Sequence, residues 1–364
     1  MRMRIQTIQD HNLGNRLQNY ALQEVLVGMT GLEVETYRHW YDAGYAVFGR
    51  PALFQARKCL VGVYKRFAHD GRWLAFERFD REHVHYGGPI VGKELTRQVA
   101  CEEKRDVVCV IGSDQVWNPE FGFTGEMEYA PFVPKKRKIA YAASFGVSEI
   151  KGQRARTASL LNDIAFVSVR ERSGARIVHE LTGRDVPVVL DPTMLIETDA
   201  WGPLMCMPRA VPGVLDNPFC LTYMLGTNGF YEDICLLCNE RGLAVSDLSS
   251  PGFAVGPAEF LWLVQNASLV CTDSYHAMVF SLLFHTPFAA FERGGAVEMS
   301  DRIATLDYDF DLACCQWGSA GFDIHAQDDV FWRNVDDRLK RRREMSREWL
   351  TGALAGVLSG GRGV

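Results

Sequence analysis

The chain has 364 residues, of which 47% are hydrophobic and 23% are charged, and its formal net charge is −6. This length predicts two domains of ordinary size, and the acidic balance excludes the basic face that a nucleic-acid-binding domain needs. We expect neither a signal peptide nor a membrane span, because the start has no apolar run and the longest apolar stretch, residues 277–291, is interrupted. Ten cysteines without an export signal then indicate reduced thiols and a cytoplasmic location.

The first half of the chain alternates strand-like and helix-like segments. Short apolar or alternating runs predict strands, and apolar residues three or four positions apart predict amphipathic helices. The fold class expected from this alternation is α/β, with a parallel, Rossmann-like sheet. The predicted strands are residues 4–8, 32–37, 106–112, 138–144, 165–170 and 186–191, and the predicted helices are residues 16–29, 152–163 and 173–181.

A proline-rich stretch separates this half from the next. Residues 199–218 contain Pro203, Pro208, Pro212 and Pro218, and proline at that density sustains neither a helix nor a central strand. We therefore expect a linker there. It would join an N-terminal Rossmann-like domain, residues 1–198, to a C-terminal one, residues 219–328, with strands at 219–225, 243–248, 268–272 and 287–292 and helices at 230–242, 257–267 and 274–284.

Two segments fit the alternation less well. Residues 40–80 mix aromatic and basic side chains and predict an insertion of one or two amphipathic helices. Such an insertion packs its aromatic face on its own domain or lies on a membrane surface, here as a peripheral contact with the inner face. Residues 329–364 have apolar side chains at helical spacing and predict a C-terminal helix that packs back on a domain.

Polar residues follow the first predicted strand. Asn12, Gly14 and Asn15 form the turn into the first helix. Glycine lets the backbone approach a ligand closely, and the free amides of a helix N-terminus favour an anion. The alternative interpretation is an ordinary capping turn.

The buried strand at residues 106–112 ends in a second polar group. Ser113, Asp114 and Gln115 come directly after it, and Trp117 follows. A carboxylate, an amide and an indole at the mouth of a parallel sheet are typical of sugar binding, because the indole offers an apolar face and the polar groups bond hydroxyls. The alternative is that Ser113 and Asp114 only cap the next turn.

A third strand, residues 165–170, ends with Arg170 and is followed by Glu171. An arginine beside a helix N-terminus suits a phosphate or a carboxylate, which it can bind with two hydrogen bonds. A structural ion pair with a neighbouring acid is the alternative.

The fourth polar group is the "TDSYH" stretch. Asp273 ends a strand, Ser274 caps the next helix and His276 lies in its first turn. An imidazole in that position can serve as general acid or base near neutral pH, whereas a histidine in an apolar helix is otherwise a core residue. No metal site is predicted, because the one CxxC pair, Cys235 and Cys238, has no second pair at the spacing of a zinc site.

Taken together, "NLGNRLQNYALQ", "GSDQVWN", "VSVRERSGARIVHELTGRDVPVVLDPT" and "TDSYHAMVFSLLFHTPF" resemble the polysaccharide pyruvyl transferase family. The resemblance covers the chain from Ile5 to about Arg302. It implies a two-domain fold like that of GT-B glycosyltransferases, with the domains facing a cleft and the N-terminal one on the acceptor side. It also implies transfer of the pyruvyl unit of phosphoenolpyruvate onto two hydroxyls of a sugar, as a ketal on a cell-surface glycan or exopolysaccharide.

The resemblance implies roles for individual residues. His276 would be the acid-base catalyst with Asp114, and Arg170, Ser274 and Arg302 would bind the donor. Some members of the family carry an arginine where this chain has Ser274. Phosphoenolpyruvate is expected as a co-substrate with no other cofactor, and the acceptor is a sugar or a lipid-linked oligosaccharide, bound by Asn12, Gly14, Asn15, Gln115 and Trp117, with Asp273 and Glu171 close by.

Two other functions fit the same residues. A GT-B glycosyltransferase that uses a nucleotide sugar would need a carboxylate for the ribose hydroxyls, and Glu292 is the candidate. A catalytically silent binding subunit of a glycan-assembly complex is the third reading, motivated by Ser274 and by the aromatic and basic segment. No oligomeric state is predicted.

Overall fold

The computed structural model describes residues 1–39, 71–92, 97–101, 106–122, 124–208, 218–226, 229–250, 254–294 and 300–359. The chain forms two compact units. Unit 1 comprises Met1–Ala68, Asp80–Ile196 and Arg342–Val364, and unit 2 comprises His69–Phe79 and Glu197–Arg341. Each unit has a parallel sheet of its own, which confirms the predicted α/β class with two Rossmann-like domains.

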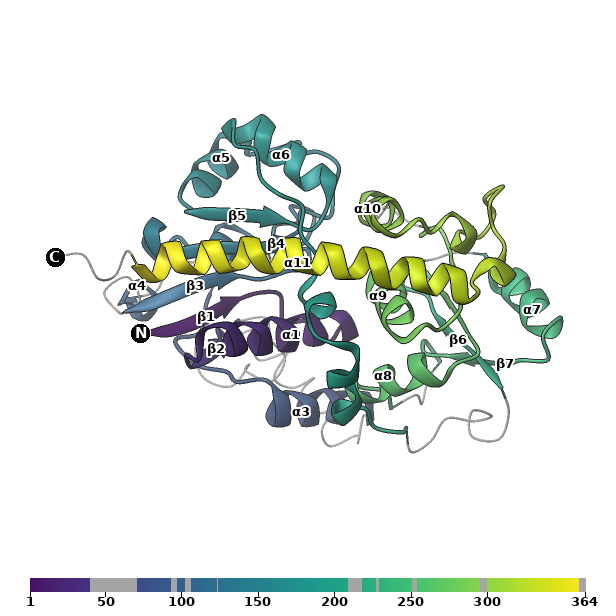
Figure 1. Ribbon diagram of the computed structural model, residues 1–364. Coiled ribbons are helices and arrows are strands. Elements are labelled where there is room, and N and C mark those ends of the chain that lie inside the picture. Colours follow the sequence, from purple (N-terminus) through teal and green to yellow (C-terminus); the bar gives the residue numbers. More distant parts are fainter. Residues whose placement is uncertain are drawn as a thin grey trace. The chain divides into compact units, whose positions relative to one another are not determined.

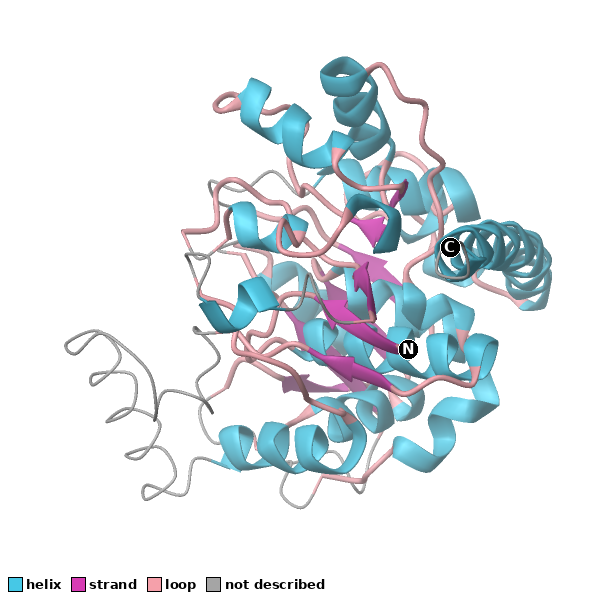
Figure 2. Cartoon of the chain, turned by 90° about the vertical axis from the view of Figure 1, so that its left-hand side faces the viewer, coloured by secondary structure: helices cyan, strands magenta, loops and turns pink. Residues whose placement is uncertain are grey.

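Unit 1 is built on a five-stranded sheet. Its strands are β1 (Arg2–Gln6), β2 (Val34–Thr36), β3 (Val107–Ile111), β4 (Lys138–Ala143) and β5 (Phe166–Val169), and its helices include α1 (Leu13–Thr30), α4 (Arg97–Ala100), α5 (Arg154–Asn162) and α6 (Arg172–Thr182). The strand order is β2-β1-β3-β4-β5, and all neighbours are parallel. Helices lie on both faces of the sheet (Figures 1 and 2), so the central strand β3, with sequence VVCVI, is buried along its whole length.

Unit 2 repeats this pattern with a four-stranded sheet. Its strands are β6 (Phe219–Tyr223), β7 (Ala244–Asp247), β8 (Leu269–Thr272) and β9 (Phe288–Ala290), and its helices include α7 (Tyr231–Asn239), α8 (Pro257–Asn266), α9 (Tyr275–Phe284) and α10 (Ser300–Phe310). The order is β7-β6-β8-β9, again parallel. Helix α9 is apolar on all sides because it is almost completely buried.

Short 3-10 helices connect these elements. They are η3 (Glu126–Tyr129), η4 (Lys135–Arg137) and η5 (Pro192–Leu195) in unit 1, and η6 (Thr198–Leu204), η7 (Ala313–Cys315) and η8 (Ile324–Ala326) in unit 2. The strand predicted at residues 186–191 is wrong: Val188 forms only a single bridge with Val169. Pro187 lacks an amide hydrogen for a ladder, and Pro192 starts η5 soon afterwards.

Helix α3 (Gly71–His83) departs from the predicted domain bounds. Residues 40–70 of the predicted insertion lie outside the described residues, but the start of α3 belongs to unit 2 and not to a continuous domain 1–198. Arg78 forms an ion pair with Glu259. A Cβ atom at Gly71 would lie 2.5 Å from the Cβ of Ala254, so the glycine permits the close approach.

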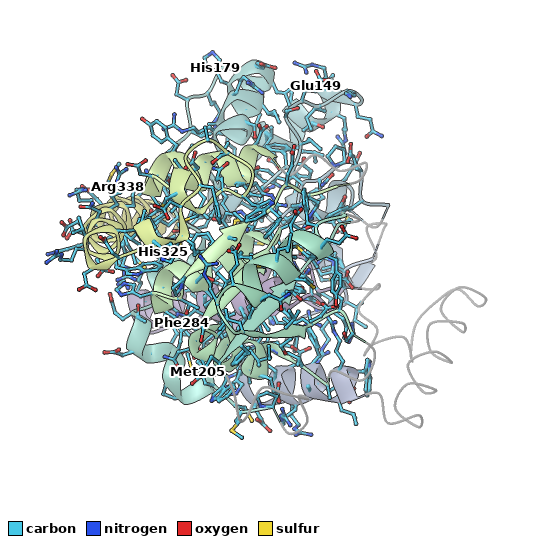
Figure 3. All side chains as sticks on the ribbon, turned by 90° about the vertical axis from the view of Figure 1, so that its right-hand side faces the viewer. Glu149, His179, Met205, Phe284, His325 and Arg338 are labelled. Carbon is cyan, nitrogen blue, oxygen red and sulfur yellow. The ribbon has the colours of Figure 1, made fainter. Side chains whose placement is uncertain are left out.

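Helix α11 (Asp329–Ser359) is also divided between the units, at Arg341. Its first part packs within unit 2, where Arg338 lies 3.4 Å from Asp311 (Figure 3). Its second part packs within unit 1, where the Nε atom of Arg343 donates to the carbonyl of Met194 at 2.8 Å. The other division falls between Ile196 and Glu197, just before the predicted linker 199–218, of which residues 209–217 lie outside the described part.

Candidate functional site

The strand order of unit 1 creates a switch point between β1 and β3. In open parallel sheets, ligands bind outside the carboxyl ends of the strands at the place where the strand order reverses. Asn12 and Asn15 follow β1, and Asp114 follows β3. The side-chain amide of Asn15 donates a hydrogen bond to the Oδ2 atom of Asp114, so the structure joins two predicted site residues across this point.

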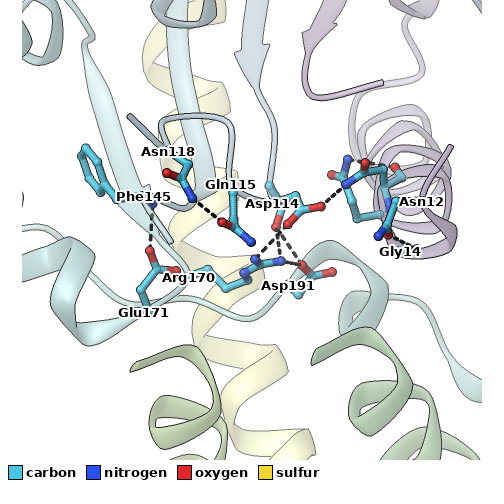
Figure 4. A network of polar contacts seen from close by, with 12 residues as sticks. Asn12, Gly14, Asp114, Gln115, Asn118, Phe145, Arg170, Glu171 and Asp191 are labelled. Carbon is cyan, nitrogen blue, oxygen red and sulfur yellow. Dashed lines mark hydrogen bonds and ion pairs between the residues drawn. The ribbon is translucent and has the colours of Figure 1, made fainter. Parts of the chain in front are cut away.

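Asp114 has an unusual backbone conformation. Its φ angle is +69°, in the left-handed region that residues other than glycine rarely adopt. The amides of Val116 and Ser144 both donate to its carbonyl, at 2.7 and 3.0 Å, and hold the turn. The turn directs the carboxylate toward the carboxyl edge of the sheet, where it lies beside Arg170 (Figure 4).

Arg170 is 3% exposed and lies between two carboxylates. Its Nη2 atom is 3.2 Å from Asp114, and its Nη1 atom is 2.8 Å from Asp191. Asp191 also accepts hydrogen bonds from the hydroxyls of Ser113, at 2.7 Å, and Thr193, at 2.7 Å. Arg170 therefore lies in an ion-pair network, which was the alternative interpretation, and its predicted binding of a donor anion stays a prediction.

The sequence reasoning missed Asp191 as a member of this network. A signal was present, because Asp191 ends the predicted strand 186–191, as Asp114 follows strand 106–112. Helix α11 holds the loop that carries it: Leu190 donates its amide hydrogen to Ser346, and Arg342 donates to the carbonyl of Val188 at 3.2 Å.

Asn12 and Gly14 have capping roles. Asn12 is the N-cap of α1, and its Oδ1 atom accepts from the amides of Gly14, at 2.9 Å, and Asn15, at 3.4 Å. These hydrogen bonds show the capping turn that was the alternative interpretation, and the role of these residues in ligand binding stays a prediction.

Gln115 and Glu171 support the loops around the network. The Oε1 atom of Gln115 accepts from the side chain of Asn118 at 2.5 Å, and Glu171, which is fully buried, accepts from the amide of Phe145 at 2.9 Å (Figure 4). Glu171 is also the N-cap residue of α6. It therefore ties the loop after β4 to the start of that helix.

Trp117 lies in the core of unit 1. It is 3% exposed, stacks on Tyr129 with ring centroids 5.0 Å apart, and contacts Phe145. An indole that is packed in this way offers no open face to a sugar ring, so the predicted stacking role of Trp117 is corrected to a core role.

Unit 2 has a corresponding switch point between β6 and β8. Asp273 follows β8, is fully buried, and accepts from the amides of Leu225, at 2.7 Å, and Gly226, at 2.8 Å, which follow β6. The Nε atom of Arg293, which follows β9, lies 3.5 Å from its Oδ2 atom. Asp273 thus fastens three strand ends together.

Ser274 and His276 lie where the sequence predicted, at the start of α9. Ser274 is the N-cap residue, although its side chain makes no capping hydrogen bond, and His276 follows in the first turn with 6% exposure. Arg302 comes from the first turn of α10, and its guanidinium lies 5.9 Å from the ring centroid of Tyr275, the neighbour of His276. The structure therefore brings Ser274, His276 and Arg302 into one neighbourhood of unit 2.

Among the described residues, no group of three or more histidine, cysteine, aspartate or glutamate side chains has the arrangement of a metal site. No described helix combines the length and the apolar character that crossing a bilayer requires.

The chain is similar to several solved structures at low sequence identity. A protein described as UDP-N-acetylglucosamine 2-epimerase from Listeria monocytogenes has 10% identity and a TM-score of 0.47, with 96% of this chain and 89% of that chain covered. UDP-GlcNAc 2-epimerase from Neisseria meningitidis, bound to UDP-GlcNAc, has 8% identity and a TM-score of 0.39, with 94% and 93% covered. The glycotransferase of kitacinnamycin has 11% identity and a TM-score of 0.40, with 96% of each chain covered.

No curated protein matches the sequence. A family model described as polysaccharide pyruvyl transferase matches residues 12–295. This range contains the polar residues after β1, β3, β5 and β8. The chain therefore belongs to the polysaccharide pyruvyl transferase family.

Proposed function

We propose that the protein transfers the pyruvyl group of phosphoenolpyruvate to two hydroxyls of a sugar as a cyclic ketal, during the synthesis of a cell-surface glycan or exopolysaccharide. The observation that carries the proposal is the family match over residues 12–295, which includes the strand-end residues of both units. The family implies a transferase with a sugar or glycan acceptor. Phosphoenolpyruvate enters as co-substrate, and the proposed location is the cytoplasm.

The proposed reaction follows from the chemistry of the donor. Protonation of the methylene carbon of phosphoenolpyruvate makes the adjacent carbon an oxocarbenium-like electrophile, to which one sugar hydroxyl adds. The second hydroxyl then replaces phosphate and closes the ketal. One hydroxyl proton balances the proton that is delivered to carbon, and the other leaves with phosphate. The path needs a proton donor, a base for the hydroxyls and cations for the donor anion.

His276 is the proposed general acid-base catalyst. It lies in the first turn of a buried helix, directly after β8, where its backbone is fixed by packing. An imidazole can both give and accept a proton near neutral pH. Ser274, two residues earlier at the N-cap of the same helix, has no charge and is proposed to give the donor a hydrogen bond only.

Asp114 is the proposed partner of the acceptor hydroxyls. Its carboxylate oxygens accept hydrogen bonds from Asn15 and Arg170, and an ionised carboxylate can accept several hydrogen bonds. Asn15 and Arg170 are therefore positioning residues in this proposal, because they fix the direction of the carboxylate.

Calorimetric titration tests the donor. We expect saturable binding of phosphoenolpyruvate to the full chain and no binding of UDP-N-acetylglucosamine. Binding of the nucleotide sugar alone would contradict the proposal and favour the glycosyltransferase alternative. Association with a glycan-assembly complex, with no binding of either donor, would favour the silent subunit.

Turnover tests the role of His276. Phosphate released from phosphoenolpyruvate would be measured with a panel of glycosides that carry two neighbouring hydroxyls. His276→Gln should slow release by roughly 100-fold or more, the usual contribution of a general acid, and should leave the melting temperature nearly unchanged. The matched control is His325→Gln, at an exposed position in η8 of the same unit. A large loss of stability in His276→Gln, without a specific loss of rate, would instead make His276 a core residue.

A further inference from the structure

Tyr223 has a buried hydroxyl that lies beside the guanidinium of Arg72. It is the last residue of β6, is 4% exposed, and its ring packs against Phe260 with centroids 5.7 Å apart. Among the described residues, no group accepts the proton of this hydroxyl. A phenol buried in this way at a strand end costs free energy unless a ligand completes its hydrogen bonding.

Two arginines act on this hydroxyl. Burial raises the pKa of Tyr223 to about 12, and the positive charges of Arg72 and Arg293 oppose this rise, whereas Asp273 adds to it. Arg293 is held in place by Asp273, whose carbonyl accepts from its Nη2 atom at 3.3 Å. Both arginines belong to unit 2, although Arg72 comes from the start of α3.

Arg72 is the less restrained of the two cations. It is half-buried, and within the described part of the chain it has no carboxylate partner. Its guanidinium lies 6.0 Å from the ring centroid of Phe76, one turn along the same helix. A partly buried guanidinium without a counter-ion favours an anionic ligand.

The charges at this point add up to an excess of cations. Among the described residues, Asp273 is the carboxylate whose charge acts on Tyr223 together with the charges of Arg72 and Arg293, and it is already bonded to two backbone amides. The N-terminus of α9 begins directly after it, and the side chain of its N-cap residue Ser274 makes no capping hydrogen bond to the first-turn amides. Those amides favour negative charge as well.

We propose that Arg72, Tyr223 and Arg293 form a subsite that binds a phosphate monoester. The two guanidiniums bind its oxygens as charge-assisted donors, and the tyrosine hydroxyl donates a further hydrogen bond. The identity of the ligand as the phosphate of phosphoenolpyruvate rests on the proposed function. The subsite supplies the positive charge that Ser274 lacks.

Titration of the full chain with inorganic phosphate and with phosphoenolpyruvate tests the subsite. Arg72→Met should weaken both affinities by about 10- to 100-fold, as expected for the loss of a charge-assisted contact. Tyr223→Phe should weaken them about 3- to 10-fold and should leave the melting temperature nearly unchanged, because no described group of the protein accepts the proton of the hydroxyl that is removed. Arg81→Met, in the exposed end of α3, is the matched control and should bind as the parent does.

The outcomes separate the subsite from the proposed function. Parental affinities for phosphate and phosphoenolpyruvate in both Arg72→Met and Tyr223→Phe would overturn the subsite, even if pyruvyl transfer is observed. Binding of phosphate that depends on Arg72, together with no consumption of phosphoenolpyruvate, would keep the subsite and reject pyruvyl transfer. Dependence on Arg72 for UDP-N-acetylglucosamine alone would reject the assignment to a phosphate monoester.

Discussion

The switch point of unit 1 holds one guanidinium, that of Arg170, between two carboxylates. The corresponding point of unit 2 holds the guanidiniums of Arg72 and Arg293 and one carboxylate, that of Asp273. Both points follow from the same reversal of strand order. The topology therefore fixes where a ligand binds, and the side chains after the strands decide which ligand: an excess of carboxylates suits sugar hydroxyls, and an excess of arginines suits an anion.

The two switch points also differ in how far the protein satisfies its own polar groups. In unit 1, Asp191 accepts from Ser113, Thr193 and Arg170. In unit 2, the buried hydroxyl of Tyr223 lies beside Arg72, and no described group accepts its proton. The first arrangement contributes to stability before any ligand is present, whereas the second would gain a hydrogen bond when the proposed ligand binds.

Removal of a carboxylate from unit 1 should have the largest effect. Asp191→Ala leaves the buried guanidinium of Arg170 with one partner fewer and should lower the free energy of unfolding by about 3–5 kcal/mol, the usual cost of breaking a buried ion pair. Urea denaturation measures this change. Asp185→Ala is the control, because the Asp185 side chain is 94% exposed and its contact with His179 lies at the surface, where such pairs contribute about 0–1 kcal/mol.

An equal and small effect of Asp191→Ala and Asp185→Ala on the free energy of unfolding would contradict the difference between the two switch points. It would mean that the buried ion-pair network of unit 1 contributes no more to stability than a surface ion pair. Asp191→Asn should fall between the parent and Asp191→Ala, because the amide keeps an oxygen that can accept a hydrogen bond but loses the charge.

Glu128 provides a contrast to the carboxylates of the Arg170 network in unit 1. It is a buried carboxyl group with no guanidinium beside it in the described part of the chain. Burial raises its pKa from 4.5 to about 7, although backbone amides donate to it. Burial also lowers the pKa of His39 to about 3, and the Nδ1 atom of His39 lies 3.7 Å from Glu128. His39 is therefore uncharged near neutral pH, and Glu128 is uncharged below about pH 7, unlike the charged network around Arg170.

The stability of the protein should therefore depend on the titration of Glu128. Its folded pKa lies above its unfolded value, so its contribution is fully present below pH 4.5 and is lost as the pH rises through about 7. Glu128→Gln should remove this loss. The free energy of unfolding of the parent should therefore fall, relative to that of the variant, by at most about 3 kcal/mol over this pH range. His39 titrates in both proteins, with stability lost as the pH falls from 6.5 toward 3, and so cancels in the difference. Parallel curves of unfolding free energy against pH would show that Glu128 is ionised in the folded protein.

The predictable parts of the molecule are those that local patterns determine. The strands after which Asp114 and His276 lie are continuous apolar runs, and both were predicted from the sequence. The capping role of Asn12 was predicted only as an alternative, and the core position of Trp117 was not predicted, because both depend on which hydrogen bonds and packing partners the fold supplies. Asp191 was missed although it ends the predicted strand 186–191, of which the fold keeps a bridge at one residue.

The cations of unit 2 were harder to predict for a different reason. Arg72 is about 150 residues from Tyr223 in sequence, in a segment that precedes most of unit 1. No local pattern links them, because the contact depends on how α3 docks. Arg293 follows a predicted strand and could have been found by the rule that identified Arg170.

The docking of α3 gives the prediction with the smallest expected effect. Gly256 lies against the helix, and a Cβ atom there would be 2.7 Å from the Cβ and 2.9 Å from the carbonyl carbon of Ala75. Because a backbone atom cannot move aside cheaply, Gly256→Ala should lower the free energy of unfolding by about 1–3 kcal/mol. It should also weaken phosphate binding, since it shifts the helix that carries Arg72. Gly202→Ala, in η6 of the same unit, has no atom within 4 Å of the new methyl group and should change neither quantity. Equal behaviour of the two variants in urea denaturation and in phosphate titration would show that α3 does not pack on this part of unit 2. Arg293 would then be the remaining cation at the switch point of unit 2 in this proposal.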